Sequence, residues 1–230
     1  MLLYPPVSAI CPTYGRPHLL EEAIYSFLNQ DYPGTKELVV LNDFDQQTLV
    51  FDHPEVSIIN TAERYPSLGE KRNAAIALAR HDILMVWDDD DICLPHRISI
   101  SVDRLRDSCG YFKQGSKTAI MNHGIIDGIL DSSFHCSSAF TRELFTRVGG
   151  YQMLHRGEDV AFERAVFDLI GMENIVTLHA ASEHYYIYRW GGTGSYHASW
   201  YENTEEASGN QRVASHVRQA LMEAQIPQGI

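Results

Sequence analysis

An apolar run in this chain ends in four consecutive carboxylates, ILMVWDDDD at residues 83–91. A short, unbroken apolar run is typical of a strand buried on both faces of a parallel sheet. Adjacent carboxylates repel one another by about 1 kcal/mol per pair in water, so a cation should lie beside them. Because α/β proteins bind ligands at the carboxyl ends of parallel strands, we expect Mg²⁺ or Mn²⁺ at this strand end. A solvated acidic turn is the plain alternative.

The composition indicates one large globular domain and excludes several classes of protein. The chain has 230 residues, 44% of them hydrophobic. No apolar run reaches the roughly eighteen residues of a membrane span, and residues 1–10 lack the features of a signal peptide. The scattered cysteines predict neither a disulfide framework nor a zinc site and favour a cytoplasmic setting, with peripheral membrane association left open. The net charge of −12 argues against polymeric nucleic acid as a partner.

Strands and helices alternate along the first half of the chain. Short apolar segments predict strands at 6–11, 37–41, 56–60 and 83–87. Apolar residues at helical spacing predict helices at 17–30, 66–79 and 95–106. This alternation predicts an α/β fold with a doubly wound, mostly parallel sheet. Polar clusters follow three of the strands and would line one edge of the sheet together, at 13–16, 42–45 and 88–91.

The second half is less regular. Further strands are expected at 118–122, 135–140, 175–178 and 184–188. A short helix should cover 141–148, and an amphipathic helix should begin at Glu158 and stop at Gly171. The polar segment 107–117 is expected to be a surface connection, and the tail should carry one helix near 213–224.

Several motifs then occur in the order and spacing of a known family. They are Thr13-Tyr14-Gly15-Arg16, Gln30-Asp31-Tyr32-Pro33, Asn42-Asp43, Gly69 to Arg72-Asn73, Asp88 to Pro95, and Gly149-Gly150-Tyr151 followed by Glu158-Asp159. Together they resemble the family 2 glycosyltransferases over about residues 6–170. The chain departs from that family at Gly15, where asparagine is usual, and at Asn42, where an aspartate commonly reads the uracil ring.

This resemblance implies a fold and a reaction. It implies a GT-A domain over 1–200, with a Rossmann-like nucleotide-sugar-binding half over 1–95, an acceptor half over 96–200 and a tail over 201–230. It also implies an inverting transfer of one sugar from a nucleotide-diphosphate donor to an acceptor hydroxyl, with Mn²⁺ or Mg²⁺ stabilising the leaving diphosphate. A UDP-sugar is the expected donor, although the amide of Asn42 is compatible with another base.

The resemblance also assigns roles to residues. Asp159 would be the general base that accepts the proton of the acceptor hydroxyl. Asp90 would bind the metal, with Asp88 and His197 as further candidates, and the run of acids leaves Asp91 open as a ligand or a helix cap. Nucleotide-sugar contacts fall on Pro12, Thr13, Tyr14, Arg16, Asn42, Asp43, Arg72, Asp88 and Asp89. Acceptor contacts fall on Glu158, Trp190 and His155.

Each assignment has a plain structural alternative. Glu158 and Asp159 could simply complement a helix amino terminus. Arg16 and Arg72 could be surface charges. Trp190 could be a buried aromatic ring, and His155 and His197 could be solvated. Lys71, beside Arg72, is expected to be solvated. The glycine-rich segment 191–195 would suit a loop that closes over the donor and excludes water.

Rival functions fit the sequence less well. A sugar-nucleotide pyrophosphorylase would need a Gly-x-Arg loop where this chain has Cys11-Pro12-Thr13-Tyr14. An aspartate-dependent phosphatase would carry its acids on an early strand. A non-catalytic, ion-dependent carbohydrate-binding protein would have no need for Arg72 and Asp159. The acceptor, which in this family ranges over glycans, lipids, proteins and small molecules, cannot be read from the fold. Without membrane spans, transfer of a single sugar is expected rather than polymerisation.

Overall fold

The computed structural model describes residues 4–115, 117–122, 125–131, 134–175 and 183–190. The expected strand at 175–178 falls almost entirely outside these residues, as do the loop at 191–195, His197 and the expected tail helix. Within the described ranges, none of the helices is long and apolar enough to cross a membrane.

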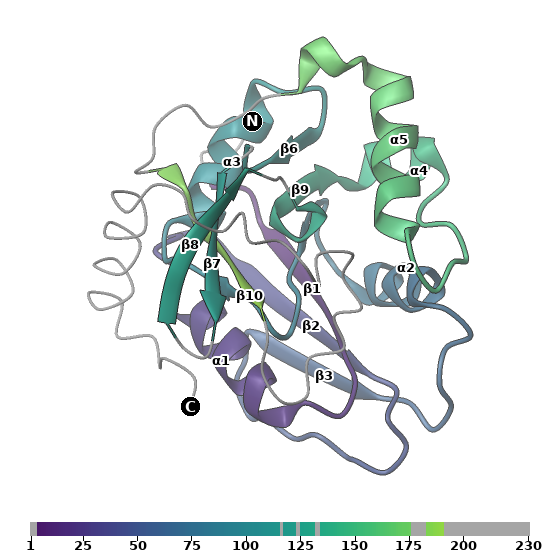
Figure 1. The fold of residues 1–230 in the computed structure, drawn as a ribbon. Coiled ribbons are helices and arrows are strands. Elements are labelled where there is room, and N and C mark those ends of the chain that lie inside the picture. The colour runs from purple at the N-terminus through teal and green to yellow at the C-terminus, as the bar shows by residue number, and fades with distance from the viewer. Residues whose placement is uncertain (1–3, 116, 123–124, 132–133, 176–182, 191–230) are drawn as a thin grey trace.

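A six-stranded sheet forms the centre of the molecule, in the order β3-β2-β1-β4-β9-β6 (Figure 1). Its strands are β1 (Val7–Thr13), β2 (Lys36–Asn42), β3 (Val56–Asn60), β4 (Ile83–Val86), β6 (Tyr111–Lys113) and β9 (Ser138–Thr141). Strands β1 to β4 pair in parallel, whereas β9 pairs antiparallel with both β4 and β6. The predicted mostly parallel sheet is therefore confirmed, and the carboxyl ends of β1, β2 and β4 reach the same edge.

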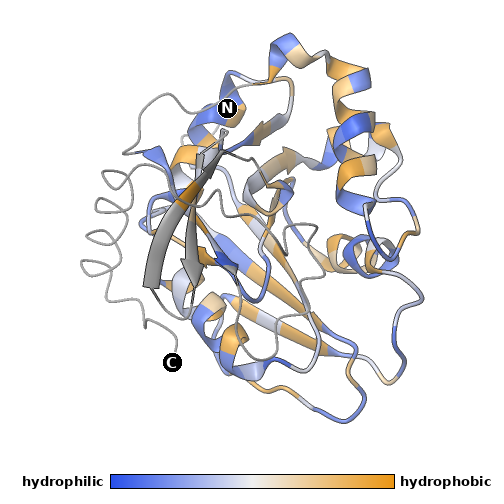
Figure 2. Cartoon of the chain, in the orientation of Figure 1, coloured by the Kyte–Doolittle hydropathy of each residue, from blue (hydrophilic) through white to orange (hydrophobic). Residues whose placement is uncertain are grey.

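Helices cover both faces of this sheet. They are α1 (Pro17–Leu28), α2 (Leu68–Leu78), α3 (Arg97–Arg106), α4 (Arg142–Val148) and α5 (Glu158–Ile170), with short 3₁₀ turns η1 (His135–Ser137) and η2 (Met172–Asn174). Alternate strand residues point to opposite faces, so Ala9 and Cys11 pack in the core with α1 and α3, whereas Ile10 packs with α2, α4 and α5. Figure 2 shows hydrophobic residues concentrated along the central strands. The result is a three-layer α/β arrangement.

The sequence explains where several helices begin and end. Pro17 occupies the first turn of α1, where its missing N–H costs nothing. Ser67 and Glu70 form a reciprocal cap on α2: the Glu70 N–H donates to Ser67 Oγ (3.2 Å) and the Ser67 hydroxyl donates to the Glu70 carboxylate (2.8 Å). Gly149 ends α4 in the left-handed conformation, with φ of 84°.

Gln30, in the motif after the first helix, joins α1 to α3. Its Nε2 donates to the carbonyl of Leu94 (2.9 Å), and its Oε1 accepts from the Ile98 N–H in the first turn of α3 (3.0 Å). The side chain is buried, so these bonds satisfy polar groups that water cannot reach. The motif thus fixes the helix that follows the acidic run.

A second, four-stranded sheet was not predicted. It has the order β5-β10-β7-β8, with β5 (Ile92–Cys93), β7 (Lys117–Asn122), β8 (Ile125–Asp131) and β10 (Tyr186–Trp190). β10 pairs antiparallel with β5 and parallel with β7. Because β5 directly follows the four carboxylates, the acidic run is attached to the central sheet through β4 and to this second sheet through β5.

The expectation of a surface connection over 107–117 is wrong. Tyr111 and Phe112 are fully buried in β6, at the edge of the central sheet. The strand is only three residues long, too short for an alternating pattern to stand out. The expected strand at 135–140 is correct only in its second part, because residues 135–137 form the turn η1.

Candidate active site

The acidic run lies in the loop between β4 and β5, and Arg16 binds two of its carboxylates. Its guanidinium donates to Asp89 and, through Nη1, to Asp90 Oδ2 at 2.5 Å. Thr13, at the end of β1, donates its hydroxyl to Asp89 Oδ2 at 2.6 Å. Burial and the neighbouring Asp90 raise the pKa of Asp89, while Arg16 and Thr13 oppose that rise. Two sequence motifs are thereby brought into direct contact.

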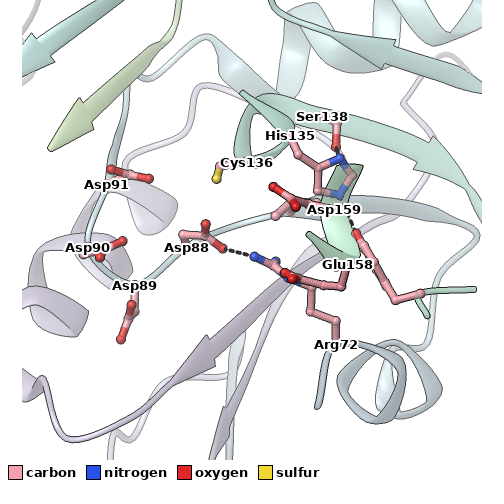
Figure 3. Close-up of polar contacts among 12 residues, drawn as sticks. Arg72, Asp88, Asp89, Asp90, Asp91, His135, Cys136, Ser138, Glu158 and Asp159 are labelled. Carbon is pink, nitrogen blue, oxygen red and sulfur yellow. Dashed lines mark hydrogen bonds and ion pairs between the residues drawn. The ribbon is translucent and has the colours of Figure 1, made fainter. Parts of the chain in front are cut away.

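Arg72, on α2, bridges the acidic loop and the start of α5. Its Nη2 lies 3.1 Å from Asp88 Oδ1, and its Nε lies 3.4 Å from Glu158 Oε1 (Figure 3). Burial disfavours the charge of Arg72, but Asp88, Tyr151 and Glu158 together raise the pKa of the guanidinium. Burial also raises the pKa of Glu158, against the effect of Arg72. The expectation of a surface arginine is therefore excluded.

Asp91 is held by the second sheet. Its carboxylate accepts from the hydroxyl of Tyr186 and from the backbone N–H of Arg189 at 2.8 Å. The Arg189 side chain in turn donates to the carbonyl of Asp90 (2.7 Å) and binds Glu22 on α1. Late residues of the chain therefore fix the geometry of the acidic run.

The end of β2 is occupied by polar contacts within the protein. The two amide hydrogens of Asn42 go to the carbonyl of Gln47 (2.8 Å) and to Asn60 Oδ1 (2.9 Å). Asp43 accepts from the N–H of Tyr65 (3.0 Å) and binds Lys71. Asn42 thus shapes the loop after β2, and its contact with the nucleotide base stays a prediction.

The expectation that Lys71 is solvated is wrong. Its side chain is buried, and its ammonium donates to the carbonyl of Thr13 at 2.6 Å as well as to Asp43. Burial lowers the pKa of Lys71, and Asp43 opposes that effect. Lys71 ties α2 to the ends of β1 and β2, a role that depends on strand neighbours distant in sequence.

Tyr14, in the turn after β1, lies among aromatic and cationic side chains. Its ring centroid is 4.9 Å from that of Phe44, and the guanidinium of Arg64 lies 4.2 Å from the Tyr14 ring. Pro12 is buried within β1, opposite Leu41 of β2, and so belongs to the strand that leads into this turn. The arrangement offers a partly exposed aromatic surface at the edge of the site.

Glu158 and Asp159 begin α5. The loop before them is pressed against α2: a Cβ on Gly69 would lie 1.8 Å from the carbonyl oxygen of Gln152. Glu158 is buried, whereas Asp159 is partly exposed, with Oδ1 accepting from the N–H of Val160 at 2.8 Å. Asp159 therefore remains open to an incoming molecule.

The structure says less about the two remaining acceptor candidates, His155 and Trp190. His155 is exposed in the loop before α5. The backbone of Trp190 ends β10, but its side chain lies outside the described part of the structure, as does all of His197. Their assigned roles stay predictions.

Asp88, Asp91 and Cys136 form a group suited to a metal ion. One ligand atom from each lies within 4.8 Å of the others. Carboxylate oxygens suit Mg²⁺ and Mn²⁺, so the donor set fits a divalent cation. Burial, Asp88 and Asp91 raise the pKa of the Cys136 thiol, and Arg72 opposes the rise. The predicted ligand Asp90 faces Arg16 instead, and its assignment stays a prediction.

Arg97 is a residue that sequence reasoning missed. It lies in the first turn of α3, fully buried, with its guanidinium 4.5 Å from the ring of Trp87. Its Nη2 donates to the carbonyl of Val86 at the end of β4 and to that of Cys136 (2.8 Å). A single side chain thereby joins the strand that leads into the acidic run to the turn that carries Cys136.

A second buried network lies behind Arg72. Glu163, on α5, accepts from the hydroxyl of Tyr111 (2.6 Å) and from Lys113 (2.8 Å), and contacts His135 Nδ1 (3.2 Å). His135 Nε2 lies 2.6 Å from the hydroxyl of Tyr151, whose ring lies 5.8 Å from the Arg72 guanidinium. Tyr151 of the Gly-Gly-Tyr motif is thus held by His135 at its hydroxyl and lies beside Arg72 with its ring.

We expect Glu163→Gln to destabilise the protein in a pH-dependent way. Burial alone would raise the pKa of Glu163, but His135 and Lys113 lower it from 4.5 to about 2. Because the pKa of Glu163 is lower in the folded than in the unfolded protein, its ionised carboxylate stabilises the folded state at any pH above about 4.5. This stabilisation is lost as the pH falls from about 4.5 to about 2. The difference between the folded and unfolded pKa values of Glu163 corresponds to roughly 3 kcal/mol of folding free energy near neutral pH.

Urea unfolding of wild type and Glu163→Gln at pH 7 and at pH 3 measures this effect. The gap between the two proteins should shrink at the lower pH. Asp168→Asn, which removes an exposed carboxylate from the same helix, should show little difference at either pH. A gap for Glu163→Gln that is equal at both pH values would contradict the assigned ion pairs.

Comparison with known proteins gives consistent matches. The family model described as "Glycosyl transferase family 2" matches residues 8–156. WcaA of Escherichia coli (strain K12), named as a glycosyl transferase of colanic acid biosynthesis, is 30% identical over 103 residues, covering 42% of this chain and 36% of WcaA. The match thus spans only about a third of that relative.

Solved structures share the fold. Staphylococcus aureus TarS 1–349 in complex with UDP-GlcNAc has a TM-score of 0.65 at 17% identity, covering 96% of this chain and 71% of TarS 1–349. The same protein in complex with UDP has a TM-score of 0.60 at 17% identity, covering 80% of this chain and 60% of the other. At this identity the likeness is one of fold.

Proposed function

The chain belongs to glycosyl transferase family 2, and from this premise we propose that it moves one sugar from a nucleoside-diphosphate donor to an acceptor hydroxyl. One observation carries the proposal. The acidic loop after β4 contacts the turn after β1 through Arg16, and Arg72 links it to the start of α5. Groups suited to a charged donor therefore adjoin a partly exposed carboxylate, Asp159, suited to proton transfer.

We propose that the donor nucleotide lies along the ends of β1 and β4. The Tyr14 ring offers a face for a base or a ribose, and Thr13 and Asp89 define the floor beside it. The UDP and UDP-GlcNAc complexes of TarS, which has this fold, support uridine diphosphate as the carrier. Arg16 and Arg72 supply positive charge near the diphosphate, where fixed guanidinium groups bind phosphate well.

We propose that a divalent cation assists departure of the diphosphate. Asp88 and Asp91 would hold it, because their carboxylates converge with Cys136. A bound Mn²⁺ or Mg²⁺ would stabilise the charge that develops on the leaving group. Arg72, paired to Asp88 at 3.1 Å, holds that carboxylate in place.

Inversion requires a base on the side of the sugar opposite the leaving group. We propose that Asp159 accepts the proton of the acceptor hydroxyl as that oxygen attacks the anomeric carbon. Glu158, its neighbour, is instead engaged by Arg72 and serves to fix the start of α5. The two adjacent acids would therefore have different tasks, one exposed to the acceptor and one buried.

A panel of nucleotide-sugars, screened by thermal shift with Mn²⁺, tests this function. At least one UDP-sugar should raise the melting temperature, because a ligand that binds only the folded state stabilises it. Slow release of UDP from the same sugar should follow without an acceptor. Binding with no hydrolysis and no transfer to any acceptor would favour the non-catalytic carbohydrate-binding alternative. The absence of stabilisation by every nucleotide-sugar would contradict the proposal.

A further inference from the structure

Cys136 is placed beside the acidic run by the pairing of two strands. β9 runs antiparallel to β4, with Met85 opposite Ala139. Cys136 lies in the turn η1 just before β9, and its sulfur lies within 4.8 Å of ligand atoms of Asp88 and Asp91. Arg97 bonds to the carbonyls of Val86 and Cys136 and so holds the two segments together. The backbone that carries Cys136 is therefore tied to the strand that leads into the acidic run.

We propose that Cys136 is a third protein ligand of the cation at Asp88 and Asp91, and that its sulfur makes the site prefer thiophilic divalent ions to Mg²⁺. The proposal rests on the metal dependence proposed above. The three ligand atoms lie within 4.8 Å of one another, a separation that one ion can bridge. Thiolate ligands favour ions such as Zn²⁺, Co²⁺ and Cd²⁺, whereas Mg²⁺ is bound through oxygen alone.

A bound divalent ion would offset most of the negative charge of the site. Two carboxylates and one thiolate would carry three negative charges, and Arg72 offsets only part of them, because it pairs with Glu158 as well as with Asp88. A divalent ion would offset two further charges. On coordination the thiol proton of Cys136 passes to solvent and a sulfur–metal bond forms, with no change of oxidation state.

Titration of the full chain with Co²⁺, without donor or acceptor, tests this inference. Thiolate coordination produces a near-ultraviolet charge-transfer band that oxygen ligands do not give. Wild type should show the band, saturating at one equivalent of Co²⁺. Cys136→Ser should lose the band and bind Cd²⁺ at least about tenfold more weakly, while its affinity for Mg²⁺ stays unchanged.

Cys109→Ser is the matched control, because it removes an exposed thiol from another part of the molecule. This variant should keep the band at wild-type intensity. A band that persists in Cys136→Ser, or one that is absent from the wild type, would overturn the proposal. Melting curves check that each variant is folded. If the band is absent while UDP-sugars still bind with Mg²⁺, the sulfur ligand is wrong and the proposed transferase function stands.

Discussion

Asp159→Asn should lower kcat for sugar transfer by about a thousandfold, because removal of a general base typically costs between a hundredfold and ten-thousandfold. The asparagine keeps the shape of the side chain and its bond to the Val160 N–H, so α5 should still begin in the same place. Donor affinity should stay unchanged, since Arg16, Arg72 and the acidic loop lie on other elements. Initial rates and calorimetric titration of the donor measure the two effects separately.

Asp168→Asn is the control for this prediction, because it makes the same chemical change at an exposed site on α5. It should transfer sugar at the wild-type rate. If Asp159→Asn kept full transfer activity on the true acceptor, the base would lie elsewhere. If it lost donor affinity in the same proportion, Asp159 would belong to the donor site.

Arg97→Met should reduce the free energy of unfolding by about 2–4 kcal/mol, because each buried polar group left without its hydrogen-bond partner costs about 1–3 kcal/mol. Methionine fills much of the space but donates no hydrogen bond. The carbonyls of Val86 and Cys136 would lose a buried donor, and Trp87 would lose the cation above its ring. Urea unfolding monitored by tryptophan fluorescence and circular dichroism measures the loss.

Arg106→Met, at the far end of the same helix, is the matched control. Its guanidinium lies 3.9 Å from Asp103 at the surface, a kind of pair that contributes less than about 1 kcal/mol. The two variants should therefore differ clearly in stability. Equal stability of the two variants would show that Arg97 does not join β4 to the η1 turn in the way its contacts indicate.

The first half of the fold could be predicted because its signals are local. Apolar runs and helical spacing correctly predicted β1 to β4 and α1 to α3, with small shifts at their ends. The second sheet and the edge strand β6 of the central sheet could not be predicted, because β5 and β6 are two and three residues long and their pairing depends on segments distant in sequence. A strand that short carries no periodic signal.

The sequence predicted many of the residues of the candidate site but few of the contacts between them. Repulsion within the acidic run correctly indicated a need for positive charge, and Arg16 and Arg72 supply part of it. Lys71 and Cys136 were missed because a lysine on a helix and an isolated cysteine look the same in sequence whether buried or exposed. Only the fold brings Lys71 to Asp43 and Cys136 to Asp88.

We propose that the acidic end of β4 binds the donor diphosphate. Calorimetric titration of UDP with Mn²⁺ into wild type, Asp88→Asn and Asp82→Asn tests this binding. Asp82 precedes the opposite end of the same strand and is exposed, so its variant controls for the loss of one charge. We predict that UDP binds wild type and Asp82→Asn equally and binds Asp88→Asn about tenfold more weakly or worse. Equal affinity in all three proteins, or no binding to any of them, would contradict the claim.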